Sequence, residues 1–289
     1  INFTLQFPEN NTLFIGKNLI TLKKVDSTNN YAKLLLANSG PVPSGTVILA
    51  DEQSGGRGQG NARWLSEPEK NLTFSLILHN DFLSPADQFY LNMAVSLGVV
   101  EGLSALLPTP QVSSPSSPMK SPERDLGRIK WPNDIFFGQR KLGGILIENM
   151  LAGAILKTSV VGIGLNVNQE QFRGLKQATS LKLETGRDFL LKPLLAGIFH
   201  SLEARYLQLR GGAREQLRKA YLDQLLGYDR PRLFRLVQGP AKHREAGILS
   251  DIPDAFEGVI RGVSPEGRLL VETNGCIQSF DKKEIEFLF

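Results

Sequence analysis

The sequence contains few of the residues on which several classes of function depend. Its 289 residues include one cysteine, Cys276, which excludes an intrachain disulfide and any metal site built from several cysteines. Its three histidines, His79, His200 and His243, lie far apart along the chain, so we expect no histidine-rich metal centre. No apolar run approaches the roughly 18 residues of a membrane-spanning helix, and the first residues do not resemble a signal peptide. These absences favour a cytoplasmic protein without a membrane segment.

Positive charge is present in small excess only. The chain has 33 Lys and Arg against 29 Asp and Glu, a net charge of +4, without the clustered basic residues that nucleic-acid-binding proteins carry. We therefore expect no specific nucleic-acid partner. Hydrophobic residues make up 41% of the chain, which is enough for a sizeable core, and the length fits one large or two ordinary domains.

Helical and strand patterns alternate through the first two thirds of the chain. The predicted helices are 24–40, 85–107, 188–209 and 213–226. The predicted strands are 46–50, 71–78, 129–137, 141–150 and 154–167, the last three joined by tight turns. The Pro- and Ser-rich segment 108–127 has too few apolar residues to offset the entropy of ordering, and we expect an exposed loop there. Together these elements predict an α/β (α+β) domain with a mixed sheet flanked by helices.

The C-terminal part has a different pattern, of short strands separated by hairpin turns. The predicted strands are 233–237, 256–263, 268–272, 276–280 and 285–289. Asn274-Gly275 is a strong hairpin signal. The pattern predicts a small β-barrel as a second domain, with Cys276 as an inert packing residue.

A glycine-rich stretch, residues 55–60, follows the predicted strand 46–50. Glycines let backbone N–H groups approach an anion closely, and Arg57 adds a fixed positive charge that binds phosphate or carboxylate oxygens. The stretch has neither the Lys-Ser/Thr ending of a P-loop nor the spacing of a dinucleotide fingerprint. Taken alone, such a stretch is more often an ordinary surface turn.

A second cluster is Lys130-Trp131-Pro132-Asn133-Asp134. Pro132 interrupts strand pairing and predicts a bulge that re-aims its neighbours. Asn133 offers the donors and acceptors that base recognition needs, and Asp134 suits a hard cation or a lysine partner. The alternative is a structural turn, and for Lys130 by itself we favour a solvated lysine.

Glycines also stand beside polar residues in the next two predicted strands. Lys141 lies across a short turn from Asp134, with Gly144 close behind it. Gly162 and Gly164 interrupt an otherwise β-branched strand, which usually marks the close approach of a ligand or another backbone. For residues 162–168, glycines that pack beneath a helix would be an equally good explanation.

Asp26-Ser27-Thr28-Asn29 stands at the start of the first predicted helix. Ser and Thr are common N-caps, so we favour capping, although a helix N-terminus can also bind an anionic group. We expect Trp64 to be a partly buried core residue rather than a base-stacking platform.

Taken together and in this order, these segments resemble the biotin–protein ligases. That family combines a Ser-Thr-Asn helix start with Q-x-x-G-R-G, K-W-P-N-D, K-[LI]-[AG]-G-I-L and G-x-G-x-N-x-N, and ends in an SH3-like barrel. The corresponding residues here are 27–29, 53–58, 130–134, 141–146 and 162–168. The resemblance implies a catalytic domain at 1–229 and an SH3-like barrel at 230–289. It also implies the monofunctional type without an N-terminal DNA-binding domain, because the first motif begins within thirty residues of Ile1.

The resemblance implies a ligase that works in two steps. The carboxylate of biotin attacks the α-phosphate of ATP, giving biotinyl-5′-AMP and pyrophosphate. A lysine of a biotin carboxyl carrier domain, the expected partner, then attacks the acyl carbon and displaces AMP. Mg²⁺ accompanies ATP. Neutralising and positioning anions is the main task in such displacements. The family also allows a homodimer.

By motif match, the resemblance assigns three sets of site residues. Arg57 and Lys141 form the catalytic pair that neutralises charge where carboxylate meets phosphate. The biotin-binding residues are Ser27, Thr28, Asn29, Gln53, Gly56, Arg57, Gly58, Gln59, Lys141, Gly144 and Gly164. The residues that bind ATP and the adenylate are Arg57, Gly58, Gln59, Trp64, Lys130, Asn133, Lys141 and Asn166, with Asp134 contributing to Mg²⁺ binding.

Gln59 departs from the family pattern, because many relatives carry a second arginine in G-R-G-R-x-G. A neutral amide cannot neutralise a phosphate as a guanidinium does, so we expect faster release of biotinyl-AMP than in relatives with the arginine. An unchanged release rate in Gln59→Arg would contradict this hypothesis.

Three alternative functions remain beside the ligase. A lipoate–protein ligase resembles the catalytic domain, although K-W-P-N-D and the barrel favour biotin. A non-catalytic biotin-adenylate sensor would bind without transfer, although retention of Arg57 and Lys141 favours catalysis. A DNA-binding repressor is disfavoured, since the early position of the first motif leaves no room for its winged helix.

Overall fold

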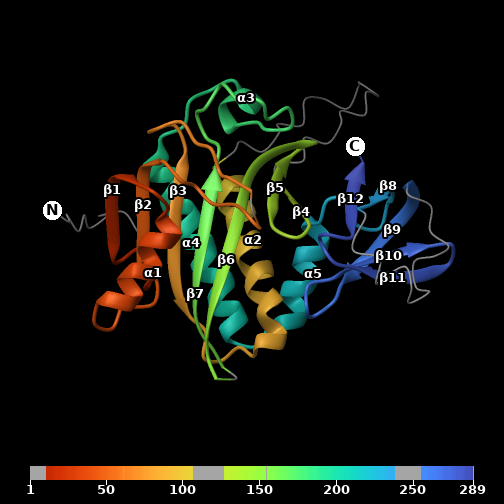
Figure 1. Cartoon of the computed structure of the whole chain (residues 1–289), viewed down its shortest axis with the longest axis horizontal. Coiled ribbons are helices and arrows are strands. Elements are labelled where there is room, and N and C mark those ends of the chain that lie inside the picture. Colours follow the sequence, from red (N-terminus) through yellow and green to blue (C-terminus); the bar gives the residue numbers. More distant parts are fainter. Residues whose placement is uncertain (1–10, 61, 107–126, 154, 238–254, 289) are drawn as a thin grey trace, which may run out of the picture.

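The computed structural model describes residues 11–60, 62–106, 127–153, 155–237 and 255–288. These residues form a seven-stranded sheet with helices on its faces and, beside it, a five-stranded antiparallel sheet at the C-terminal end (Figure 1). The predicted order, an α/β domain followed by a small β domain, is confirmed.

The seven-stranded sheet has the order β1-β2-β3-β7-β6-β5-β4. β1 and β2 run parallel and the other neighbouring pairs antiparallel, so the sheet is mixed, as predicted. Its strands are β1 (Leu19–Val25), β2 (Val47–Gln53), β3 (Leu72–His79), β4 (Arg128–Lys130), β5 (Asp134–Phe137), β6 (Arg140–Ala152) and β7 (Ile155–Leu165). The predicted meander corresponds to β5, β6 and β7.

Helices lie on both faces of this sheet. α1 (Thr28–Asn38) packs on one face, where Ile48, Ile77 and Val160 are buried. On the opposite face, α2 and α4 belong to the main core (Figure 1). These two helices approach so closely that a Cβ on Gly98 would lie 2.7 Å from the Cα of Leu202. The remaining bounds are η1 (Pro85–Asp87), α2 (Gln88–Ser104), α3 (Leu181–Thr185), α4 (Leu191–Arg210) and α5 (Arg214–Gln224).

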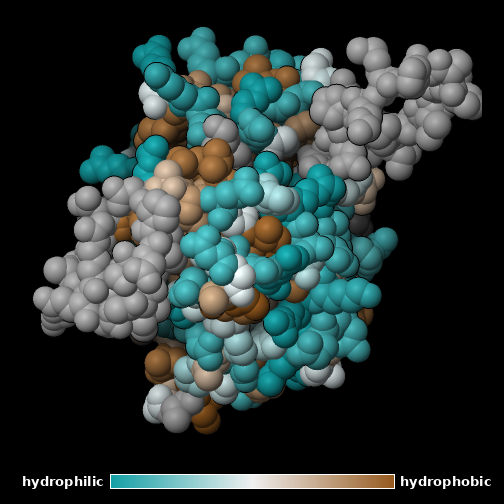
Figure 2. All heavy atoms as spheres, turned by 90° about the vertical axis from the view of Figure 1, so that its right-hand side faces the viewer, coloured by the Kyte–Doolittle hydropathy of each residue, from teal (hydrophilic) through white to brown (hydrophobic). Residues whose placement is uncertain are grey.

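The five-stranded sheet, called the C-terminal sheet below, has the order β11-β10-β9-β8-β12. Its strands are β8 (Pro231–Leu236), β9 (Ala255–Val263), β10 (Leu269–Thr273), β11 (Cys276–Phe280) and β12 (Ile285–Leu288). Its core is aromatic, with the Phe234 ring stacked on Phe256 and edge-on to Phe287. The described surface on this side of the molecule is mostly hydrophilic (Figure 2). A hydrogen bond of 2.9 Å from Trp131 Nε1 to the carbonyl oxygen of Gly267 links this sheet to the domain of the seven-stranded sheet.

The predicted helix 24–40 begins too early. Residues 19–25 form β1 instead, because they pair in parallel with β2, and Lys24 makes an ion pair of 2.5 Å with Glu52 across that pairing. Ser27 has an extended backbone at the N-cap, and the helix ends at Asn38, before the predicted end at residue 40.

The predicted strand 129–137 is two strands. β4 and β5 pair with each other in antiparallel register, so the chain reverses between them, through a turn that contains the cis peptide bond Trp131–Pro132. The proline therefore marks a reversal rather than the bulge that we predicted.

Two smaller predictions are also corrected. Cys276 is exposed rather than packed, because β11 is an edge strand of the C-terminal sheet. The short helix α3 was not predicted. The predicted loop 108–127 lies outside the described residues except for Gly127. No helix in the part of the chain that the structure describes is long and apolar enough to cross a membrane.

Candidate functional site

A pocket lies on the face of the seven-stranded sheet that carries the N-terminus of α1. The glycine-rich loop after β2, the turn before β5, and strands β3, β6 and β7 surround it. Its lining consists of Ser27, Thr28, Asn29, Gln53, Arg57, Gly58, Gln59, Ala62, Arg63, Trp64, Thr73, Phe74, Asn133, Asp134, Lys141, Gly144, Ile145, Leu146, Gly162, Ile163, Gly164 and Lys282.

Most of the residues assigned from the resemblance therefore meet in one place. The exceptions are Gly56, Lys130 and Asn166. Lys130 and Asn166 line a second hollow beside the pocket, and the two share Arg63, Trp64, Asp134 and Lys141.

The start of α1 is tied to the end of β2. Gln53 Oε1 accepts hydrogen bonds from the backbone N–H of Thr28 at 2.7 Å and from its hydroxyl at 3.1 Å. Ser75 on β3 donates to Asn29 Oδ1 at 2.6 Å. Ser27 occupies the N-cap position, but its side chain makes no capping hydrogen bond. The favoured capping interpretation therefore explains the position of Ser27 and not its buried hydroxyl.

The glycine-rich loop is folded against β7 by Trp64. The backbone N–H of Trp64 donates to the carbonyl oxygen of Gly56 at 2.9 Å, and a Cβ on Gly56 would lie 2.3 Å from the Trp64 oxygen. A Cβ on Gly164 would lie 2.4 Å from the indole. Glycine is thus required at both positions for the loop to cross the sheet. Gly162 is approached in the same way by Asn29.

Four buried polar atoms around the two hollows have no hydrogen-bond partner among the described residues: Thr73 Oγ1, Asn133 Oδ1, Asn166 Oδ1 and Trp64 Nε1. Both asparagine amides are anchored through their NH₂ groups, Asn133 to the carbonyl oxygen of Ile145 and Asn166 to that of Thr179. An unpaired buried polar atom is costly, so these atoms favour a ligand that supplies the missing partners.

The proposed lysine of the catalytic pair is held by a carboxylate. Lys141 Nζ lies 2.7 Å from Asp134 Oδ1, across the β5–β6 pairing. Lys130 is half-buried rather than solvated, with its ammonium 5.0 Å from the ring centre of Phe136 and 5.5 Å from that of Phe287. Burial lowers the pKa of Lys130, against the attraction of Asp134.

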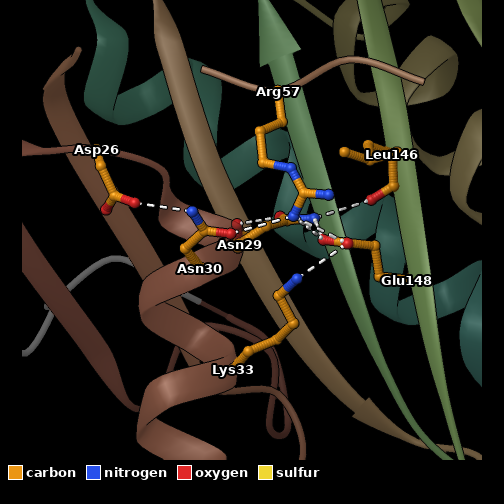
Figure 3. A network of polar contacts seen from close by, with 8 residues as sticks. Asp26, Asn29, Asn30, Lys33, Arg57, Leu146 and Glu148 are labelled. Atoms are coloured by element: carbon orange, nitrogen blue, oxygen red, sulfur yellow. Dashed lines mark hydrogen bonds and ion pairs between the residues drawn. The ribbon is translucent and has the colours of Figure 1, made fainter. Parts of the chain in front are cut away.

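Arg57 points towards Glu148 on β6 (Figure 3). The two form an ion pair of 3.0 Å, and the same carboxylate accepts from Lys33 at 3.0 Å and from Asn29 at 2.8 Å. Arg57 also donates to Asn30 at 3.1 Å. Burial alone would raise the pKa of Glu148, but the hydrogen bonds from Asn29 and Lys33 and the positive charges of Lys33 and Arg57 lower it. Glu148 thus stays ionised and fixes the arginine.

Glu148 and Lys282 were not predicted from the sequence. Glu148 could have been found, because it lies on the same strand face as Gly144 and Leu146 at a period of two. Lys282 belongs to the turn between β11 and β12 of the C-terminal sheet, and its ammonium donates to Gln59 Oε1. No motif marks it.

The pocket is suited to binding anions. Among its lining residues, four are cationic (Arg57, Arg63, Lys141 and Lys282) and one, Asp134, is acidic. The described residues contain no cluster of three or more His, Cys, Asp or Glu side chains that could hold a metal ion. The arrangement can neutralise and position charged groups of a substrate.

Comparison with known proteins identifies the family. The model of the biotin/lipoate A/B protein ligase family matches residues 21–166, about half of the chain. The chain belongs to this family of ligases.

More specific similarity is to biotin ligases. The bifunctional ligase/repressor BirA of Bacillus spizizenii is 29% identical over 280 residues, covering 95% of this chain and 75% of that protein. The biotin–[acetyl-CoA-carboxylase] ligase of Paracoccus denitrificans is 30% identical over 263 residues, covering 86% and 96%. The solved structure of the biotin protein ligase from Aquifex aeolicus in complex with biotin and ATP has a TM-score of 0.70 at 26% identity, covering 94% of this chain and 99% of that one.

Proposed function

We propose that the protein attaches biotin to a lysine of a biotin carboxyl carrier domain, in two steps through biotinyl-5′-AMP. The observation that carries this proposal is the cation-rich pocket in which the N-terminus of α1, Arg57 and Lys141 meet. The similarity of the chain to a biotin protein ligase solved with biotin and ATP supports the same two substrates here.

In the first step, a carboxylate oxygen of biotin attacks the α-phosphorus of ATP and pyrophosphate leaves. Lys141 and Arg57 would neutralise the charge that gathers between the two anions. In the second step, the neutral amine of the acceptor lysine attacks the acyl carbon, the acyl–phosphate bond breaks, and AMP leaves. Ser27, Thr28, Asn29 and Gln53 would bind the ring and tail of biotin.

The nucleotide would extend into the second hollow, where Asn166 and Lys130 lie. The free Oδ1 atoms of Asn133 and Asn166 would accept from the base, and Trp64 would cover it. Mg²⁺ is usually bound through one or two carboxylates and the substrate phosphates. Asp134, the single carboxylate among the lining residues of both hollows, fits this role. We place the boundary of the catalytic domain near residue 229.

A biotinylation assay tests this proposal. Purified protein, ATP, Mg²⁺, biotin and an isolated carrier domain are mixed, and the mass of the carrier is followed. We expect a gain of one biotin on one lysine, slowed about 100-fold or more in Lys141→Ala and Arg57→Ala because each removes a charge that stabilises the transition state. Lys157→Ala is the matched control, since Lys157 is exposed on β7 outside both hollows. In Asp134→Asn, the Mg²⁺ concentration at half-maximal rate should rise.

The other outcomes separate the alternatives. Transfer of lipoate and not of biotin would leave the assigned fold unchanged. It would mean that lipoate, rather than biotin, is the acid that the protein attaches. Tight biotin binding with neither adenylate nor transfer would indicate a sensor. Full activity of Lys141→Ala would overturn the assigned role of that lysine.

A further inference from the structure

A mostly buried carboxylate lies behind the second hollow, outside the lining of both hollows. It belongs to Glu184 on α3, the short helix that follows β7 (Figure 1), and 11% of its side chain is exposed. Glu184 accepts a hydrogen bond of 2.5 Å from the hydroxyl of Thr179 and pairs with Arg140 at 2.8 Å. None of these three residues lines either hollow, so contact with a substrate does not account for the cluster.

Thr179 holds the amide of Asn166. It is fully buried, and its carbonyl oxygen accepts a hydrogen bond from Asn166 Nδ2 at 2.9 Å. The backbone N–H of Leu181, two residues further on, donates to the carbonyl oxygen of Asn166 at 3.1 Å. The segment between β7 and α3 therefore holds Asn166 by its side chain and by its backbone. The direction of Asn166 Oδ1 follows from the position of Thr179.

The same segment also holds Lys141. The backbone N–H of Lys141 donates to the carbonyl oxygen of Gln177 at 2.6 Å, and its carbonyl oxygen accepts from the N–H of Thr179 at 2.9 Å. Arg140, the second partner of Glu184, is the residue before Lys141. One carboxylate thus ties α3 both to the segment that holds Asn166 and to the start of β6.

The segment depends on such single contacts. Residues 166–180 are all described, and they belong to no helix or strand of the fold. Hydrogen bonds to a charged group are roughly twice as strong as those between neutral groups. The contact between Thr179 and Glu184 is therefore well suited to fix the segment in one position.

We propose that Glu184 is a positioning residue for the nucleotide end of the site. Through Thr179 it aims the amide of Asn166. Through Arg140 it steadies the start of β6, where Lys141 lies. This inference rests on the proposed function. The biotin end is held separately, by hydrogen bonds from β2 and β3 to the start of α1, so loss of the Glu184 contacts should weaken ATP binding and spare biotin binding.

Adenylation kinetics of three variants test the inference. Thr179→Val removes the hydroxyl that donates to Glu184, Thr179→Ser keeps a hydroxyl, and Glu184→Gln removes the charge. For Thr179→Val and Glu184→Gln we expect the KM for ATP to rise about fivefold and the KM for biotin to stay within about twofold, because a charged hydrogen bond is weakened at the nucleotide end only. In Thr179→Ser the KM for ATP should stay within about twofold of the parent. Glu184→Gln should also lower kcat, since it alone releases Arg140.

Glu170→Gln is the matched control. Glu170 stands in the same segment and pairs with Lys182 at 2.7 Å, with most of its side chain exposed and outside both hollows. Its replacement should leave both KM values within about twofold, as for a surface change. An ATP KM unaltered in Thr179→Val would overturn the proposal. An equal rise in the KM for biotin, an equal rise in Glu170→Gln, or the same loss in Thr179→Ser would overturn it as well.

Calorimetric titration with ATP separates this inference from the proposed function. If the parent forms no adenylate, the proposed function fails. Weaker binding of ATP to Thr179→Val than to the parent and to Thr179→Ser would still support the positioning role. Equal binding to all three proteins would overturn it.

Discussion

Glu148 organises one side of the pocket through a single carboxylate. It contacts Asn29 and Lys33 of α1 and Arg57 of the glycine-rich loop, three side chains from two segments of the chain. Its own position on β6 is fixed by the sheet. The orientation of Arg57 therefore depends on a residue that does not itself line the pocket.

Replacing Glu148 by glutamine should weaken this arrangement in a pH-dependent way. The variant keeps an acceptor for Asn29 but loses both ion pairs, so we expect a loss of about 1 kcal/mol in the free energy of unfolding at pH 7 and weaker biotin binding. The folded pKa of Glu148 is below its ordinary value. Its contribution is therefore complete above the ordinary glutamate pKa of about 4.3 and is lost as the pH falls through the lower folded value.

Urea unfolding of parent and variant at a series of pH values measures this difference. Glu52→Gln is the control, since Glu52 makes a more exposed ion pair with Lys24 and should change stability by less than about 0.5 kcal/mol. A difference for Glu148→Gln that does not shrink in acid would argue against the ion pairs as its cause.

Among single residues, the sequence could indicate those that follow a local rule. Arg57 and Lys141 stand in short motifs, and Glu148 shares a strand face with Gly144. Lys282 follows no such rule, because its place in the pocket depends on how one folded sheet docks on another. The packing of Lys130 against Phe287 depends on the same docking and was likewise missed.

At the scale of elements, the glycine-rich loop and β7 are matched to each other. A methyl group at Gly164 would lie 2.4–2.8 Å from atoms of the Trp64 indole, so the ring and the loop would have to move. We expect Gly164→Ala to cost about 1–3 kcal/mol in stability, as overpacking does, and to slow adenylate formation more than tenfold. Gly40→Ala is the control, because no atom lies within 4 Å of a Cβ there.

Thermal unfolding and the adenylation rate check this prediction. A variant with wild-type activity would mean that Trp64 can move without consequence for the site, and the loop would then not need its contact with β7.

Elements whose apolar pattern is local were predictable, and those defined by their partners were not. α2 and the meander β5-β6-β7 follow from apolar spacing and tight turns. β1 was missed because its residues alternate poorly and are held as a strand by pairing with β2. The reversal at Trp131–Asn133 was read as a bulge, since a proline in a strand pattern does not distinguish the two.

At the scale of the whole molecule, Trp131 couples the C-terminal sheet to the catalytic domain. Trp131→Phe keeps most of the buried ring and removes the hydrogen bond to Gly267, so we expect the free energy of unfolding to fall by about 1 kcal/mol. Trp131 does not line the pocket, so the KM for biotin in adenylation should stay within about twofold. Calorimetry and adenylation kinetics measure the two effects, and an unchanged Tm would contradict the coupling.

The two anchored asparagines have a consequence for selectivity. Because Ile145 and Thr179 fix the NH₂ groups of Asn133 and Asn166, neither amide can turn over to present a donor. Both therefore present a buried acceptor oxygen that has no partner among the described residues. If the proposed nucleotide binds there, a base with an amino group would satisfy these oxygens, whereas a base with a carbonyl group would set oxygen against oxygen. The two fixed amide oxygens would thus repel a nucleotide whose base presents a carbonyl group, and would still accept hydrogen bonds from one whose base presents an amino group.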